Sequence, residues 1–284
     1  MLKSLGIALA VAVSVSACAP TAQNTAQSLA VEQQRSQKHV QDLDRKGALM
    51  KDRGLNSYLN SVVNRIAPQR PPGSVPLKSY IVKSADVNAY TTGGGYMFYN
   101  AGLMAAMENE AQLAAVVAHE IAHIDRGHIP AKTANNQAVQ LGAAAAAIGG
   151  ALLGVPGQVT ELAVGVGANA YASSYSRTQE RDADSTGVQY LSAAGYNAAE
   201  GARSFKVLQE LYGNERGVFA THPAPGERFA NLTTQAKQLG ATKGRVGNET
   251  HDAAVRKLRR DVLKFYESEG RTKEASLIRR NLRN

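Results

Sequence analysis

Two histidines and a glutamate lie within one short stretch of the chain, the segment HEIAH that starts at His119 and ends at His123. If this stretch is helical, the two histidines share a face, because side chains four residues apart point the same way. Two imidazoles held in this way can bind a single zinc ion. Glu120 would then lie close enough to take a proton from a water molecule without coordinating the metal. The spacing therefore predicts a metal-assisted hydrolytic site.

A hydrolytic zinc site commonly has three protein ligands and one open position. His128 is near in sequence, but nine residues of continued helix would carry it to the side opposite His119, so we do not expect it to bind the metal. In the segment QERDAD, Glu180 and Asp184 are four residues apart on one predicted helical face. Glu180 is a candidate third ligand, and Asp184 is a candidate acceptor for a ring N–H of a ligand histidine. Spacing alone equally fits a surface acidic helix paired with arginines.

The elements expected around these residues are mostly helices, with a small sheet. Apolar positions three and four apart predict a helix over 55–66, and a second helix is predicted from about Glu108 through Arg126. Alternating apolar residues predict a strand over 77–84. A short strand, the glycine turn Gly93-Gly94-Gly95 and a second strand from Tyr96 to Tyr99 follow. We interpret the glycines as a tight turn that permits close backbone approach.

Two later segments are distinctive in composition. Residues 133–160 carry no charge, and their apolar core from Leu141 to Val155 is shorter than the roughly 20 residues that a membrane-spanning helix needs. They predict an Ala/Gly-rich helical hairpin over 133–170, either buried in the protein or docked on a membrane. Residues 241–284 predict a basic helical extension, for which a solvated amphipathic helix is favoured over contact with anionic lipid.

The N-terminus is typical of a secretory signal, with Lys3, an apolar run and small residues. The only cysteine of the chain, Cys18, lies where a lipoprotein is lipidated, so we expect a signal peptide over 1–17 and a flexible tether over 18–40. Ordinary cleavage is the alternative. Ala19 follows the cysteine, and no aspartate does; by resemblance to the sorting of enterobacterial lipoproteins, this implies the outer membrane, facing the periplasm, as the expected location. The net charge of +9 comes without a nucleic-acid-binding motif, so no nucleic-acid partner is expected.

Two motifs together, VVAHEIAHIDRGH and the later SRTQERDADSTGVQYLSAAGYN, resemble the HtpX and CAAX prenyl protease family of zinc metallopeptidases. The chain is most similar to the periplasmic lipoprotein branch of that family, over roughly residues 50–235. The resemblance implies an α+β, mainly helical fold. It would be a gluzincin-type metallopeptidase domain over 41–240, with a small β-sheet whose edge strand flanks the zinc site.

The resemblance also implies roles for individual residues. One zinc ion per chain would have three ligands, His119, His123 and Glu180. Glu120 would be the catalytic base, and Asp184 would support a ligand histidine. The segment THPAPGER resembles the later histidine-proline segment of the family, which would place His222 near the zinc. There His222 would stabilise the oxyanion or occupy the open coordination position, and Arg228 would help to hold the site.

The function expected from these features is hydrolysis of peptide bonds in unfolded or misfolded envelope proteins, as periplasmic quality control. A substrate segment would add to an edge strand through main-chain hydrogen bonds, which recognises exposed backbone more than sequence. The residues expected to contact it are Gly95, Tyr96, Met97 and Phe98. The alternative is a zinc-stabilised chaperone or assembly lipoprotein that holds outer-membrane protein clients without cleaving them. Lipidated Cys18 would attach either protein to the membrane.

Overall fold

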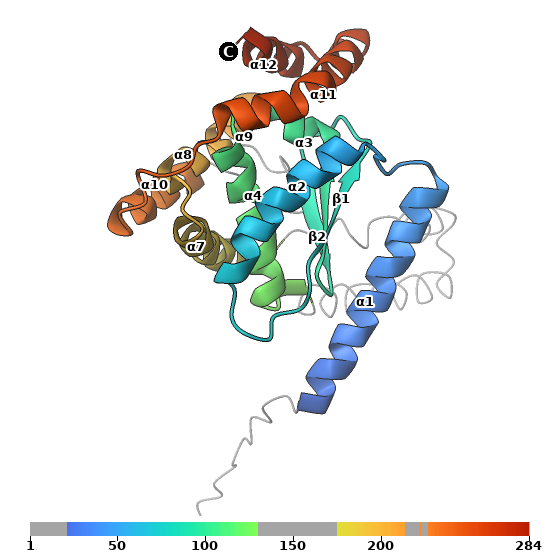
Figure 1. The fold of residues 1–284 in the computed structure, drawn as a ribbon, viewed down its shortest axis with the longest axis vertical. Coiled ribbons are helices and arrows are strands. Elements are labelled where there is room, and N and C mark those ends of the chain that lie inside the picture. The colour runs from blue at the N-terminus through green and yellow to red at the C-terminus, as the bar shows by residue number, and fades with distance from the viewer. Residues whose placement is uncertain (1–21, 130–174, 214–221, 223–226, 284) are drawn as a thin grey trace, which may run out of the picture.

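The computed structural model describes residues 22–129, 175–213, 222 and 227–283, and most of them are helical (Figure 1). The predicted α+β, mainly helical class is confirmed. Three strands form the sheet: β1 (Lys78–Val82), β2 (Ala89–Gly93) and β3 (Tyr96–Asn100). The helices are α1 (Ala22–Arg45), α2 (Arg53–Ile66), the 3-10 turn η1 (Ala67–Gln69), α3 (Ala101–Ala106), α4 (Glu110–Asp125), α7 (Arg177–Ala193), α8 (Ala198–Gly201), α9 (Ser204–Tyr212), α10 (Arg228–Gln238), α11 (Asn248–Ser268) and α12 (Thr272–Arg283).

The strand order of the sheet is β1-β3-β2, so β3 is the central strand. It pairs with β1 in parallel and with β2 in antiparallel orientation. The expectation that a substrate adds to a free edge of the strand 96–100 is therefore wrong, because both sides of that strand are taken. The short glycine turn predicts the β2–β3 pair. The parallel β1–β3 pair joins segments on either side of β2, and it leaves no local signal in the sequence.

Helix α4 passes through the interior of the domain. Thirteen of its 16 residues are buried, which makes it a core helix rather than an amphipathic surface helix. It contacts α2 and β2 and makes its most extensive contact with α7 (Figure 1). Asn109 caps its first turn by accepting a hydrogen bond from the Gln112 backbone N–H. The helix ends before Gly127, whose φ of +66° is typical of a residue just beyond a helix C-terminus.

Helix α1 lies against the β2–β3 hairpin. The Ser36 side chain is fully buried, and its hydroxyl lies 2.7 Å from the Thr92 hydroxyl. The backbone N–H of Gly94 donates to Glu32 over 2.9 Å, and a Cβ on Gly94 would lie 2.7 Å from Gln33 Cγ. The expectation of a flexible tether over 18–40 is wrong for residues 22–40, which are helical. The segment is rich in Gln and Ala, which favour helix, and the hairpin supplies the tertiary contact.

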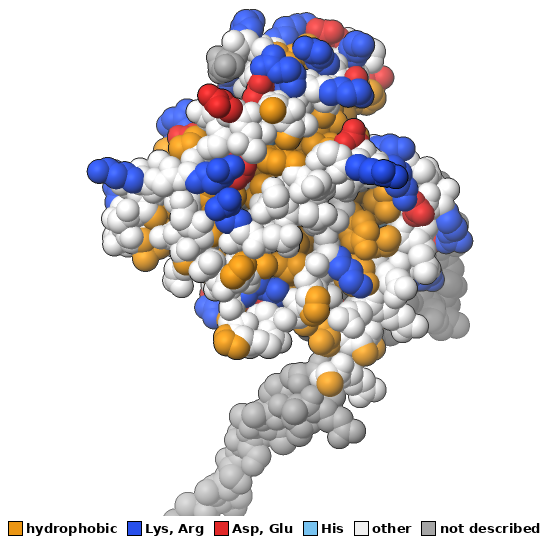
Figure 2. Space-filling model, viewed as in Figure 1, with side chains coloured by type: hydrophobic (Ala, Val, Ile, Leu, Met, Phe, Trp, Pro, Cys, Tyr) orange, Lys and Arg blue, Asp and Glu red, His pale blue; other side chains and the backbone are white. Residues whose placement is uncertain are grey.

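The C-terminal residues form α11 and α12, which pack on α3. Arg259 is almost completely buried, and its guanidinium donates to the backbone oxygens of Ala105 and Met107 at the end of α3. These contacts satisfy carbonyls that a helix end leaves unpaired. The outer face of the two helices is basic, and Figure 2 shows Lys and Arg side chains gathered over them. One face of the predicted basic extension is therefore solvated, and the other joins the core.

His251 of α11 predicts a dependence of stability on pH. It is fully buried, with Nδ1 2.8 Å from the Tyr58 hydroxyl and Nε2 3.0 Å from the Met107 carbonyl oxygen. Burial, aided by Arg259, lowers its pKa from 6.5 to about 3. Between these values the unfolded chain binds a proton that the folded protein does not, so acid favours unfolding. We expect the free energy of unfolding to fall by about 2 kcal/mol between pH 7 and pH 5 from this residue.

The measurement is urea unfolding at both pH values with equal zinc content. His251→Gln is less stable at pH 7 but does not titrate, so its free energy of unfolding should fall less between the two pH values. If the free energy of unfolding falls equally for both proteins between pH 7 and pH 5, His251 is not the source of the pH dependence.

Two predicted features lie outside the described residues. They are the N-terminal signal with Cys18 and the helical hairpin over 133–170. Within the described ranges, no helix combines the length and the apolar character needed to span a membrane.

Candidate metal centre

Helix α4 presents His119 and His123 on one face, as their spacing predicts. Both side chains are buried, and their Nε2 atoms lie 3.0 Å apart. Two nitrogens this close repel each other when both carry lone pairs, unless a cation lies beside them. The pair is therefore arranged as the two imidazole ligands of one metal ion would be.

Helix α7 brings Glu180 to this pair. A reciprocal capping box between Ser176 and Gln179 starts the helix, so Glu180 lies in its first turn. Its Oε1 lies 3.3 Å from His123 Nε2, and its Oε2 lies 3.6 Å from His119 Nε2. The two helices can approach closely because a Cβ on Gly187 would be only 3.2 Å from the His119 backbone nitrogen. The candidate third ligand thus lies beside the histidine pair.

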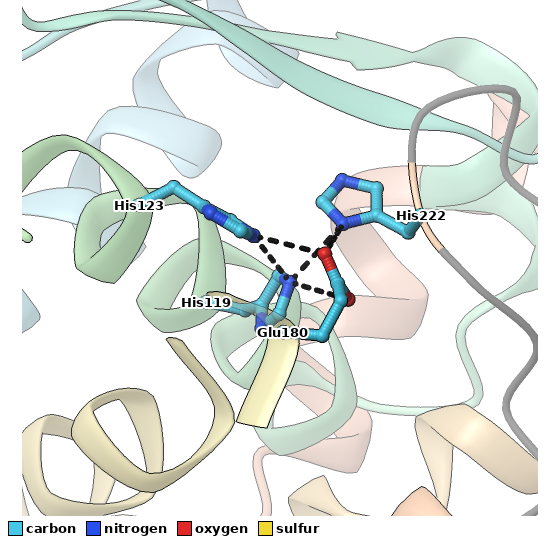
Figure 3. A group of neighbouring side chains, drawn as sticks. All are labelled: His119, His123, Glu180 and His222. Atoms are coloured by element: carbon cyan, nitrogen blue, oxygen red, sulfur yellow. Dashed lines mark hydrogen bonds and ion pairs between the residues drawn. The ribbon is translucent and has the colours of Figure 1, made fainter. Parts of the chain in front are cut away.

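His222 completes the group from a distant part of the chain. Its Nδ1 donates to Glu180 Oε1 over 2.6 Å and lies 3.4 Å from His119 Nε2. Figure 3 shows the four side chains pointing toward one another, and one donor atom from each lies within 4.8 Å of all the others. The other ring nitrogen of His222 lies 3.4 Å from Glu120 Oε1. His222 therefore lies between the metal-binding group and the candidate base.

Asp184 and Arg228 support the group from behind. Asp184 Oδ1 lies 3.0 Å from His119 Nδ1, the contact that the spacing suggested. Arg228, the first residue of α10, donates to both oxygens of Asp184 over 2.6 and 2.8 Å, and its third nitrogen lies 2.8 Å from Glu180 Oε2. The guanidinium also lies over the Phe205 ring, 4.2 Å from its centroid. One buried cation thus holds two carboxylates in place.

The charges of the group suit metal binding. Burial raises the pKa of Glu180. His222 and Arg228 outweigh this effect and hold the pKa well below its usual range. Burial lowers the pKa of His123 to about 3. Glu180 is therefore ionised and His123 neutral at neutral pH, the protonation states in which each residue binds a metal ion. Burial lowers the pKa of His222 as well, but Glu180 and Glu120 raise it to about 9.

These residues fit a zinc ion. Imidazole nitrogens and a carboxylate oxygen are ordinary zinc ligands, and the four donors are buried and convergent. Glu120 Oε2 is buried and lacks a hydrogen-bond partner among the described residues. A buried carboxylate oxygen without a partner is costly, and a water molecule or a metal ion beside it would supply one.

Two residues beside the site were not singled out as candidates from the sequence. The Tyr175 ring stacks on His123, with 3.8 Å between ring centroids, and Asp182 lies 3.2 Å from His128 Nε2. His128 itself lies 2.9 Å from His123 through their Nδ1 atoms, outside the group of four. Asp182 is two residues from Glu180, a spacing that predicts no shared helical face. Only the packing of α7 on α4 reveals its place.

The residues predicted to contact the substrate belong to the sheet. Gly95 is in the turn, and Tyr96, Met97 and Phe98 are buried in the central strand, where β1 and β2 already pair with them. None of them belongs to the group of four donors. They contribute to the core of the sheet.

Comparison with known proteins agrees with the geometry. The profile of peptidase family M48 matches residues 54–236, more than half of the chain. This chain belongs to peptidase family M48. It is a zinc metalloendopeptidase, and the buried group of His119, His123, Glu180 and His222 is suited to hold the metal.

Several curated relatives are similar to this M48 peptidase. The putative beta-barrel assembly-enhancing protease of Vibrio cholerae is 28% identical over 69% of this chain and 42% of that protein. The beta-barrel assembly-enhancing protease of Escherichia coli is 26% identical over 75% of this chain and 45% of that protein. Metalloprotease LoiP of Escherichia coli is 31% identical over 63% of this chain and 68% of that protein. The chain thus spans less than half of the two assembly-enhancing proteases.

The comparisons support the M48 family as a whole. The predicted zinc metallopeptidase family is therefore confirmed as M48. The more specific resemblance to HtpX and CAAX prenyl proteases is not supported, because the relatives above are other proteases.

Proposed function

We propose that this M48 peptidase hydrolyses peptide bonds in unfolded or misfolded proteins of the bacterial cell envelope. The observation that carries the proposal is the buried group of four convergent donors with the carboxylate of Glu120 beside it. The names of two relatives, which join beta-barrel assembly with proteolysis, support an envelope substrate.

The metal-binding residues, Glu120 and His222 have separate roles in this reaction. His119, His123 and Glu180 would hold a zinc ion, which would act as a Lewis acid toward the scissile carbonyl and lower the pKa of water. Glu120 accepts a proton from the attacking water and passes it to the leaving amine. His222, whose Nε2 lies 3.4 Å from Glu120 Oε1, donates a hydrogen bond to the developing oxyanion.

Asp184 and Arg228 orient the donors in this proposal. Asp184 accepts from His119 Nδ1, which leaves Nε2 of that ring free for the metal. Arg228 bonds to Asp184 and Glu180 at the same time. One side chain therefore fixes the metal ligand Glu180 relative to Asp184, which accepts from the ligand His119.

Since β3 has no free edge, we assign substrate binding to β2. Residues 48–50 already bond to the outer side of β1, through Met50 N–H to Ile81 and Lys83 N–H to Ala48. The outer side of β2 pairs with no other strand of the described sheet, and β2 contacts α4, which carries the two histidines. Helix α1 covers the end of β2, where the Thr92 and Gly93 carbonyl oxygens accept from Ser36, so the proposal concerns the residues before Thr92. An extended substrate backbone added to β2 would lie beside the site, and such pairing selects unfolded chains.

The location is also a proposal. The apolar run before Cys18 and the small residues around it support a signal peptide with lipidation of that cysteine. We place the protein in the periplasmic lipoprotein branch of its family, in the outer membrane and facing the periplasm. Its substrates would then be envelope proteins that fail to fold.

Removal of zinc tests the proposal. Purified protein with one zinc ion per chain should cleave unfolded casein, lose this activity after chelation and regain it when one equivalent of zinc is returned. Fragments are measured by mass spectrometry. If no zinc occupancy gives cleavage while the protein still prevents aggregation of an unfolded client, the alternative of a holding chaperone replaces the proposal.

A further inference from the structure

The ring nitrogens of the ligand histidines that face away from the metal group reach α7 by different routes. His119 Nδ1 contacts Asp184 directly. His123 Nδ1 instead lies 2.9 Å from His128 Nδ1, and His128 Nε2 lies 3.2 Å from Asp182 Oδ2. The two aspartates are two residues apart on α7. Each histidine ligand thus ends in a carboxylate of the same helix, one directly and the other through an imidazole.

The order of these contacts assigns the protons. An ionised carboxylate only accepts hydrogen bonds, so His128 donates to Asp182 from Nε2. The Nδ1 atom of the neutral His128 ring is then an acceptor, and the proton between the two Nδ1 atoms belongs to His123. When zinc rather than a proton lies between His123 Nε2 and Glu180 Oε1, which are 3.3 Å apart, Nε2 presents its lone pair to the metal group.

We propose that His128 and Asp182 are positioning residues that hold His123 in the tautomer able to bind zinc. The inference rests on the zinc site proposed above. Arg126 fixes the carboxylate, since its Nη2 donates to Asp182 Oδ1 over 2.6 Å and its Nε lies 3.0 Å from both oxygens. Tyr175 fixes the plane of the His123 ring by stacking on it at an angle of 18°.

This role explains why a third histidine follows the metal-binding pair at a spacing that excludes ligation. His128 lies just beyond the end of α4, where the chain turns at Gly127. The turn brings its ring to the outer nitrogen of His123 rather than to the metal group. Among the contacts of the described residues, Asp182 bonds to His128 and Arg126 but not to His123. His128 therefore connects His123 with this carboxylate.

Asp182→Asn separates this inference from a general loss of charge. Arg126 can only donate, so it should hold the amide oxygen in place of Oδ1, and the amide N–H₂ then faces His128 Nε2. His128 must accept there and carry its proton on Nδ1, which drives the His123 proton onto Nε2, the ligand atom. We expect zinc affinity, measured by competition with a chromophoric chelator, to fall about 10–100-fold.

His128→Asn supplies a matched rescue. Its Oδ1 is the same number of bonds from the backbone as the histidine Nδ1, and it accepts from His123 without help from Asp182. Adding Asp182→Asn to His128→Asn should therefore cause no further loss of zinc affinity. His128→Leu offers no acceptor and should lose affinity as Asp182→Asn does. Asp261→Asn removes an exposed carboxylate paired with Lys257 and should change nothing.

Nitrogen-15 NMR of the zinc-loaded protein gives a second readout. The proton of His128 should be on Nε2 in the wild type and on Nδ1 in Asp182→Asn. A wild type that binds no zinc would overturn the proposed function. A wild type that binds zinc, with Asp182→Asn equal to it in affinity, would overturn this inference alone. The same holds if the double variant loses affinity beyond His128→Asn, or if His128 of the zinc-loaded wild type carries its proton on Nδ1.

Discussion

Glu120→Gln should lower kcat/KM for peptide hydrolysis by about 10²–10⁴-fold while the protein keeps its zinc. Glu120 is not one of the four convergent donors, so the change removes no metal ligand. Burial raises the pKa of Glu120, but the contact with His222 and the nearby histidines lower it below its usual value. The side chain is therefore a carboxylate ready to accept a proton. Glutamine has the same shape but cannot take that proton.

The measurement is the rate of cleavage of an unfolded reporter, with zinc content determined by mass spectrometry on the same samples. Glu267→Gln is the matched control, because this carboxylate is exposed on α11 and pairs with Arg279. His222→Ala should be assayed alongside, and it should also lower kcat/KM, because His222 is the proposed hydrogen-bond donor to the oxyanion. Wild-type cleavage by Glu120→Gln would exclude Glu120 as the base.

Arg228→Met should destabilise the zinc-free protein by about 3–5 kcal/mol. The guanidinium is buried and neutralises two carboxylates, Asp184 and Glu180, which lie at 2.6 and 2.8 Å. Without it, buried Asp184 has no cationic partner, and Glu180 keeps only the contact with His222. Zinc would return positive charge beside Glu180, so the deficit in the free energy of unfolding should shrink at saturating zinc. Arg228→Lys keeps the charge but not the planar fork, and should fall between the two proteins.

Urea unfolding of the variants, with and without zinc, measures the effect. Arg279→Met provides the comparison, since its pair with Glu267 is exposed and should contribute no more than about 1 kcal/mol. Equal unfolding free energies for the zinc-free wild type and Arg228→Met would show that Arg228 does not hold the site together.

Local periodicity was enough to place the first half of the site. His119 and His123 lie on one face of a helix whose range, Glu110–Asp125, was predicted to within about two residues. The same argument paired Glu180 with Asp184, and the glycine turn predicted the β2–β3 hairpin. These features depend on residues close together in the sequence, where the repeat of a helix or the geometry of a turn determines which side chains meet.

Tertiary packing decided the rest. That β3 is the central strand depends on its pairing with β1, and that residues 22–45 form an ordered helix depends on contact with the hairpin. His222 joins Glu180 across a separation of 42 residues, and His128 meets Asp182 across 54. Side chains so far apart in the sequence carry no shared period, so their contact is set only when α7 packs on α4 and the buried charges must find partners.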